Sequence, residues 1–188
     1  MNAVPEHVAW YLAGFADGEG SFNVSFRPRG DYSQPWKISL CFNISQKDRV
    51  ILALFKRYLG CGTIRGRPDG VWYYEVNNFN AIWETIIPFF KRYGFLSAKK
   101  KRDFSKFCQI AEFFKTGRHL TAEGLKGILE IRRDMNDGGN RKYTDDDILG
   151  YGRSGESSET IRQTSGSNTE DEIVRSSEQS EVNINERS

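Results

Sequence analysis

Apolar and polar residues alternate along two neighbouring stretches of the chain. Phe22, Val24 and Phe26 alternate with polar residues in the first stretch, and Ile, Leu, Phe and Ile occupy every second position in the second, from Trp36 to Ile44. Strict alternation is typical of a strand with one buried face. Gly30, Asp31, Ser33 and Pro35 separate the stretches and predict a loop.

Other segments have apolar residues at helical spacing. A hairpin is predicted where two short alternating runs flank the turn residues Pro68, Asp69 and Gly70. Pro88 must kink or divide the helix that contains it. The predicted helices run from about Val8 to Gly18, from Lys47 to Leu59, from Asn80 to Tyr93, from Ala98 to Lys115 and from Thr121 to Met135, and the hairpin strands are 63–67 and 71–76.

This order of elements, αββαββα followed by further helices, predicts an α+β fold. We expect a four-stranded antiparallel sheet with helices on one face and extra C-terminal helices. Residues 1–144 form the predicted domain. Residues 145–188 are an acidic tail rich in Ser and Glu, and its lack of large apolar residues predicts disorder from about Gly150 onward.

The net charge of +2 conceals two oppositely charged parts. Residues 1–144 hold 23 of the 27 Lys and Arg and 14 of the 25 acids, whereas the last 44 residues hold 4 basic and 11 acidic groups. A basic domain indicates a polyanionic partner, although surface Lys also serves solubility. Cys41, Cys61 and Cys108 are widely spaced and are interpreted as structural thiols. Without an apolar run of 18 residues or a secretory leader, we expect an intracellular protein with no membrane partner.

The stretch LAGFADGEG at residues 12–20 combines a packing surface with an acid. Small residues at helical spacing allow another backbone to approach closely. Gly18 and Gly20 are predicted to end the helix, with Glu19 between them. Because the C-terminal end of a helix carries partial negative charge, a carboxylate there favours a cation as its partner, and we expect a divalent metal.

LAGFADGEG resembles the signature of the LAGLIDADG homing endonucleases. ISQKDR at residues 44–49, LSAKKKRDF at 96–104 and HLTAEGLKGI from His119 strengthen the resemblance. It implies a curved sheet that binds double-stranded DNA. Since the chain contains one signature, it also implies a homodimer formed through Tyr11, Leu12, Ala13, Gly14, Phe15 and Ala16.

The resemblance further implies metal-dependent catalysis. Glu19 and the backbone carbonyl of Gly18 would hold Mg²⁺ or Mn²⁺, with Ca²⁺ supporting binding without cleavage. Gln46 would orient water, and Lys99 would polarise solvent or stabilise the transition state. The adjacent Lys100 and Lys101 leave the register of this lysine open. Asp17 would shape the helix end, and Glu19 replaces the Asp of the family signature.

The outward residues of the predicted sheet suit the major groove of DNA, because Arg and Lys pair with guanine, Asn with adenine, and Ser with several bases. A solvated sheet face is the simpler alternative. The predicted DNA-binding residues are Ser21, Asn23, Ser25, Arg27, Arg29, Lys37, Ser39, Cys41, Asn43, Arg65, Arg67 and Trp72.

The sequence therefore predicts a homing endonuclease that makes a staggered double-strand break at a long pseudo-palindromic site. Its gene is expected in a group I intron, in bacteria or in a chloroplast or mitochondrion. Two alternatives stay open: a maturase that binds intron RNA through the same basic surface, and a DNA-binding regulator on a decayed endonuclease scaffold. The regulator predicts loss of the acid, which the presence of Glu19 contradicts.

Overall fold

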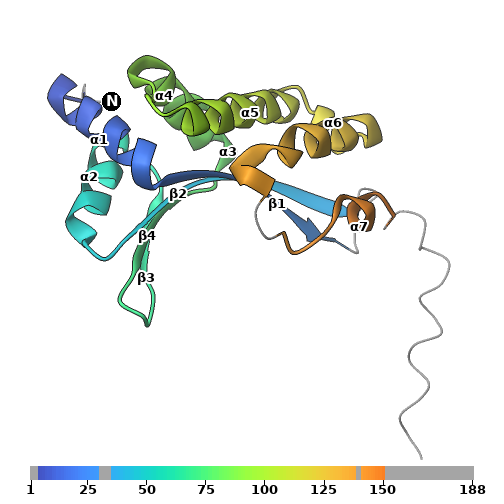
Figure 1. Cartoon of the computed structure of the whole chain (residues 1–188), viewed down its shortest axis with the longest axis horizontal. Coiled ribbons are helices and arrows are strands. Elements are labelled where there is room, and N and C mark those ends of the chain that lie inside the picture. Colours follow the sequence, from blue (N-terminus) through green and yellow to red (C-terminus); the bar gives the residue numbers. More distant parts are fainter. Residues whose placement is uncertain (1–3, 30–34, 139–140, 151–188) are drawn as a thin grey trace, which may run out of the picture. The chain divides into compact units, whose positions relative to one another are not determined.

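A computed structural model describes residues 4–29, 35–138 and 141–150. These residues belong to one compact unit, 1–155. Its centre is a four-stranded antiparallel sheet in the order β1-β2-β4-β3 (Figure 1). The predicted fold class is confirmed. The strands are β1 (Gly20–Pro28), β2 (Trp36–Gln46), β3 (Thr63–Gly66) and β4 (Trp72–Val76).

The helices lie on one face of the sheet, with α4, α5 and α6 above it in Figure 1. The α-helices are α1 (Glu6–Glu19), α2 (Arg49–Leu59), α3 (Phe79–Ala81), α4 (Ile87–Tyr93), α5 (Ala98–Lys115), α6 (Ala122–Arg133) and α7 (Asp145–Gly150). A π-helix, η1 (Ile82–Ile86), and two 3₁₀ turns, η2 (Arg118–Leu120) and η3 (Met135–Gly138), complete the described elements. None of the described helices is long and apolar enough to span a lipid bilayer.

Side-chain caps explain where several helices begin. The carboxylate of Asp48 accepts from the backbone N–H of Val50, the hydroxyl of Ser97 from that of Lys100, and the hydroxyl of Thr121 from that of Gly124. Such caps satisfy N–H groups that have no partner within the helix. Their sequence signals are strong, and the predicted bounds of α5 agree with the structure.

Pro88 divides the helix predicted from Asn80 to Tyr93. The segment consists of α3, the π-helix η1 and α4, with Pro88 in the first turn of α4. Proline lacks the N–H that would continue the ladder, and wider π turns accommodate such interruptions.

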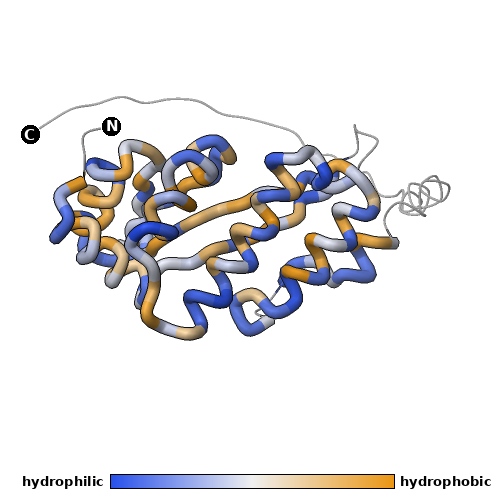
Figure 2. Tube along the Cα trace, turned by 90° about the horizontal axis from the view of Figure 1, so that it is seen from above, coloured by the Kyte–Doolittle hydropathy of each residue, from blue (hydrophilic) through white to orange (hydrophobic). Residues whose placement is uncertain are grey.

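The core lies between the sheet and the helices, and Phe22 of β1 is at its centre. The ring centroid of Phe22 is 5.0 Å from that of Phe42, 5.8 Å from that of Phe90 and 5.0 Å from that of Phe107. The rings come from β1, β2, α4 and α5 and are buried. Figure 2 shows hydrophobic and hydrophilic residues interspersed along the helices, as expected when one side of each helix packs on this core.

Helix α7 extends the folded unit into the segment assigned to the tail. Ile148 is 1% exposed and belongs to the core, and its carbonyl accepts from Nε1 of Trp36 at 2.9 Å. Three consecutive Asp residues begin this helix. Because of their charge, the composition of the segment predicted a tail and gave no sign of its one buried residue. The rest of the predicted tail, 151–188, lies outside the described residues.

The role of α7 can be tested with two adjacent residues. Ile148→Ala should lower the free energy of unfolding by about 2–4 kcal/mol, because it leaves a cavity in the core. Leu149→Ala removes a side chain that is 40% exposed and should cost less than about 1 kcal/mol. Urea unfolding of both variants measures the difference, and equal stabilities would show that α7 does not pack as described.

Candidate nucleic-acid interface and catalytic site

The helix α1 runs directly into strand β1. Gly18 is helical, so the prediction that it ends the helix is wrong; α1 continues to Glu19, and β1 begins at Gly20. The N–H of Gly20 donates to the carbonyl of Ala16. A Cβ at Gly20 would lie 2.6 Å from that carbonyl oxygen, so only glycine fits this close junction. Glu19 is exposed at the last position of the helix.

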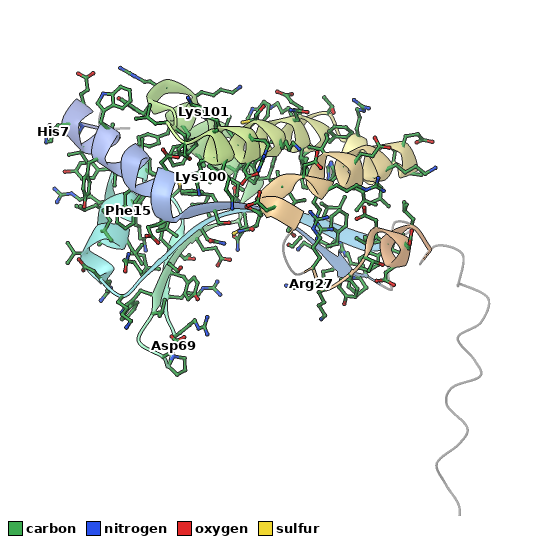
Figure 3. The ribbon with its side chains drawn as sticks, viewed as in Figure 1. His7, Phe15, Arg27, Asp69, Lys100 and Lys101 are labelled. Atoms are coloured by element: carbon green, nitrogen blue, oxygen red, sulfur yellow. The ribbon has the colours of Figure 1, made fainter. Side chains whose placement is uncertain are left out.

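Lys100 is the lysine that reaches the end of α1. Its Nζ donates to the carbonyl oxygen of Gly20. Burial lowers the pKa of Lys100, and the charge of Lys99 acts in the same direction, while Asp103, Asp17 and Glu19 oppose them. Figure 3 places Lys100 where α5 passes the start of β1. A half-buried ammonium group therefore lies within the field of Glu19.

The structure places Lys99 elsewhere. Its Nζ is 2.5 Å from a carboxylate oxygen of Asp137, and its side chain is exposed, as is that of Lys101. Successive residues of a helix point about 100° apart, so only one of three consecutive lysines can face the end of α1. That residue is Lys100. The lysine that the sequence analysis placed at Lys99 therefore lies one position later in the chain.

Asp17 joins the end of α1 to the start of α5. Its carboxylate accepts from the backbone N–H groups of Leu96 and Ser97, both at 3.0 Å, and from the hydroxyl of Ser97 at 2.5 Å. Burial raises the pKa of Asp17, but the hydrogen bonds from Ser97 and Leu96 outweigh it and hold the pKa below the usual value. These contacts agree with a structural role for Asp17.

Gln46 is the last residue of β2. The pairing of Gly20 with Ile44 puts Gln46 two residues beyond the start of β1, at the same end of the sheet as Glu19. Its side-chain oxygen accepts from the backbone N–H of Lys47 at 2.9 Å. Glu19, Lys100 and Gln46 thus come from three elements that meet at one end of the β1–β2 pair.

The face of the sheet turned away from the helices carries the predicted polar side chains; we call it the open face. In β1 and β2 it consists of the odd-numbered residues, since the even-numbered ones are buried except for Pro28 and Gln46 at the strand ends. The register places them in cross-strand pairs. The pairs are Ser21 with Asn43, Asn23 with Cys41, Ser25 with Ser39, and Arg27 with Lys37.

The open face continues onto the β3–β4 hairpin. Arg65 pairs with Tyr73, and Nη1 of Arg67 donates to the hydroxyl of Tyr73 at 2.6 Å. Arg67 also pairs with Asp69 at 3.0 Å. Figure 3 shows Arg27 and Asp69 at separate ends of the sheet, both on the side away from α5. Arg29 follows β1, where its N–H donates to the carbonyl of Pro35.

Trp72, which was predicted to bind DNA, lies on the face of the sheet opposite the open face. It pairs with Gln46 and Gly66 and therefore shares the parity of buried Tyr74. Its ring packs on the core and contacts the Arg49 guanidinium at 4.9 Å. Successive residues of a strand point to opposite faces, so a side chain at the first position of β4 is assigned to a face only by the alternation further along the strand.

The same parity adds residues that the sequence analysis missed. Ser45, Thr63, Tyr73 and Glu75 lie on the open face. Glu75 brings a carboxylate onto the open face. Burial, with a smaller contribution from Glu75, raises the pKa of the Cys41 thiol to about 12. The alternation of Tyr73 and Glu75 with Tyr74 and Val76 was the available signal.

The predicted dimer helix has two different faces. Leu12, Ala13 and Ala16 are at most 2% exposed, because they pack on the core of their own chain, so they offer little surface to a partner. Tyr11 and Gly14 are exposed, and Phe15 is half-buried. The small residues Ala13 and Ala16 thus allow α1 to approach its own sheet.

An apolar surface surrounds the exposed side of α1. Trp10 and Tyr11 are 53% and 56% exposed, and Leu96, at the start of α5, is 90% exposed. A cleft of about 360 Å³ runs beside Gly14 between α1 and the α4–α5 connection. A Cβ added to Gly14 would meet no atom of the described chain within 4 Å.

Within the described residues, no group of three His, Cys, Asp or Glu side chains could hold a metal ion. Glu19 therefore offers one carboxylate. The carbonyl group of Gly18, in the last turn, has no N–H partner within α1 and is a further oxygen ligand. The three cysteines are free thiols in this structure.

Comparison with known proteins identifies the family of this chain. The family model of the LAGLIDADG endonucleases matches residues 12–111. A probable intron-encoded endonuclease 2 from Neurospora crassa is 33% identical over 130 residues, which are 67% of this chain and 28% of the relative. The chain belongs to the LAGLIDADG endonuclease family.

Two solved structures of homing endonucleases are similar to this chain. The I-LtrWI LAGLIDADG homing endonuclease bound to target DNA is 31% identical, with a TM-score of 0.70 over 80% of this chain and 49% of its own. The homing endonuclease I-TnaI is 30% identical, with a TM-score of 0.65 over 73% of this chain and 91% of its own. The chain thus spans about half of the first structure, nearly all of the second, and little more than a quarter of the Neurospora relative.

Proposed function

We propose that this chain is a site-specific DNA endonuclease that makes a staggered double-strand break at a long, nearly palindromic site. The observation that carries the proposal is the convergence of Glu19 and Lys100 at the end of α1, where the polar open face begins. Family membership and the DNA-bound structure of I-LtrWI support it. The open face would lie along the major groove, with Arg27, Lys37 and Arg65 among its basic groups.

The donors at the helix end suit a hard divalent cation. They are carboxylate and carbonyl oxygens, which Mg²⁺ and Mn²⁺ prefer, and Mg²⁺ commonly keeps several waters beside one or two carboxylates. Glu19 and the Gly18 carbonyl would hold the ion, which would neutralise phosphate charge and activate water. Gln46 would orient water at the end of β2. The ammonium of Lys100 would stabilise charge at the scissile phosphate or exchange a proton with solvent.

A second copy of the chain would complete the site. We propose a homodimer in which the exposed side of α1, with Tyr11, Gly14 and Gly18, packs on its counterpart. Two Glu19 carboxylates would then meet near the two-fold axis, a like-charge arrangement that a divalent cation would stabilise. Because the Neurospora relative is intron-encoded by name, we also propose a group I intron in a bacterial or organellar genome for this gene.

The role of Glu19 can be separated from DNA binding. Glu19→Gln should bind the target in Ca²⁺ as the natural protein does, but its cleavage in Mg²⁺ should fall more than about a hundredfold, since a metal ligand is lost. Glu6→Gln, at the other end of α1, is the control and should cleave normally. Gel assays of binding and cleavage measure both, and normal cleavage by Glu19→Gln would remove Glu19 from the mechanism.

The assignment of Lys100 can be tested against its neighbour. Lys100→Met should reduce cleavage by about 10²–10⁴-fold with little change in binding, because a group acting on the reacting phosphate is removed. Lys101→Met deletes an exposed ammonium and should reduce cleavage less than tenfold. Single-turnover cleavage rates distinguish them. Equal losses in the two variants would indicate general phosphate attraction rather than a specific site.

The dimer is tested at Gly14. Gly14→Leu should leave the fold intact, since nothing in the described chain lies within 4 Å of an added Cβ, yet it should block the approach of a second α1. Sedimentation should show a dimer for the natural protein and a monomer for the variant. Ala53→Leu adds similar bulk to the exposed side of α2 and should remain dimeric. A natural protein that is monomeric with and without DNA would contradict the arrangement.

A further inference from the structure

The turn after α6 contacts the free edge of β1. Asn136, in η3, has a left-handed backbone, with φ 52° and ψ 36°. Its N–H donates to Oδ1 of Asp103 at 3.2 Å, and Asp103 is 2% exposed. The next residue, Asp137, pairs with Lys99 and Arg102 of α5. These contacts hold the Asn136 side chain against β1.

Hydrogen-bond chemistry determines how this side chain is oriented. The carbonyl oxygen of Phe22 can only accept, so the Asn136 atom 2.9 Å from it must be the amide nitrogen Nδ2. The same nitrogen lies 3.3 Å from the side chain of Asn23. Because Nδ2 can only donate, the Asn23 atom facing it must be the oxygen Oδ1. The usual ambiguity between the two ends of an amide is thereby removed.

A second donor occupies the same oxygen. The hydroxyl of Ser21 donates to Oδ1 of Asn23 at 3.3 Å. An amide oxygen has two acceptor positions, and these two donors use both. Asn23 lies on the open face, and no described residue accepts from its Nδ2. Two N–H donors are therefore the groups that Asn23 can offer to a ligand.

We propose that Asn136 is a positioning residue for base recognition, which fixes Asn23 as a hydrogen-bond donor. An unrestrained Asn pairs with adenine through one donor and one acceptor. With its oxygen occupied, Asn23 matches guanine, whose O6 and N7 are both acceptors in the major groove. Asn23 then prefers guanine over adenine. This inference rests on the proposed binding of DNA by the open face.

Asn43 provides an internal contrast on the neighbouring strand. Among the described residues, its Nδ2 donates only to the sulfur of Cys41, at 3.8 Å, and sulfur is a weak acceptor. The amide of Asn43 is thus held less firmly than that of Asn23. A substitution at Asn136 should change recognition by Asn23 and leave recognition by Asn43 as it was.

The test is a selection from a pool of randomised double-stranded DNA in Ca²⁺, with the full chain. Asn23→Ala identifies the position that Asn23 reads, where the natural protein should prefer guanine about tenfold. Asn136→Gly keeps the left-handed backbone and removes the amide, so adenine should rise to about the level of guanine there. Asn136→Asp replaces the donor by an acceptor that the Phe22 carbonyl repels, so it should also release the Asn23 amide and raise adenine at that position.

Three controls separate positioning from a general loss of structure. The thermal midpoint of Asn136→Gly should show a folded protein, and its preferences elsewhere in the site should match those of the natural protein. Asn43→Ala should change a different position. In the Asn23→Ala background, Asn136→Gly should have no further effect, because the residue through which it acts is absent.

The outcomes separate this inference from the proposed function. A natural protein that selects no DNA sequence would overturn both. If it selects a site, the inference is wrong when Asn23→Ala changes no base preference, or when both Asn136 variants keep the natural preference at that position. A loss of preference spread evenly over the site would also overturn it, since it would show only that η3 supports the fold.

Discussion

The arrangement of the candidate catalytic site depends on the junction at Gly20, where helix α1 is followed by strand β1 without a connecting loop. The N–H of Gly20 still donates to Ala16, while its carbonyl accepts from Lys100. No side chain fits at this residue, because the Ala16 carbonyl occupies the space of a Cβ. The direction of β1 relative to α1 is therefore fixed by covalent geometry and one close contact. Glu19 is held within two residues of Ser21, the first residue of the open face.

The helix α5 keeps this junction in place from the other side. Asp17 accepts three hydrogen bonds from Leu96 and Ser97, and Ser97 in turn caps α5. Hydrogen bonds to a charged carboxylate are stronger than neutral ones, which the lowered pKa of Asp17 reflects. The position of Lys100 along α5 then follows from the cap, since the first turn of the helix begins at a residue attached to α1. Two helices and a strand thus define one rigid site.

The sequence predicted what depends on local periodicity and failed where a long-range contact decides. Alternation placed the odd-numbered residues of β1 and β2 on one face, and the bounds predicted for α5 agree with the structure. Three consecutive lysines gave no means to choose Lys100, because the choice depends on contact with Gly20, 80 residues away. Ala13 and Ala16 carry the sequence signal of close packing, but small residues fit a helix to a sheet as well as to another helix. Ile148 was hidden among acids for the same reason: only tertiary structure shows that one residue of α7 is buried.

Two features of the single chain remain incomplete, and both lie on the same helix. The exposed side of α1 leaves more than half of the Trp10 and Tyr11 side chains uncovered by the described chain. The end of that helix offers one carboxylate where a metal site needs more oxygen donors. An exposed apolar stripe favours association, whereas two like charges brought together oppose it. Under the proposed function a divalent cation resolves the conflict, since it binds between the carboxylates that packing brings together. Association of two chains and assembly of the metal site are then one process, and a separated chain could bind DNA through its open face without the means to cut it.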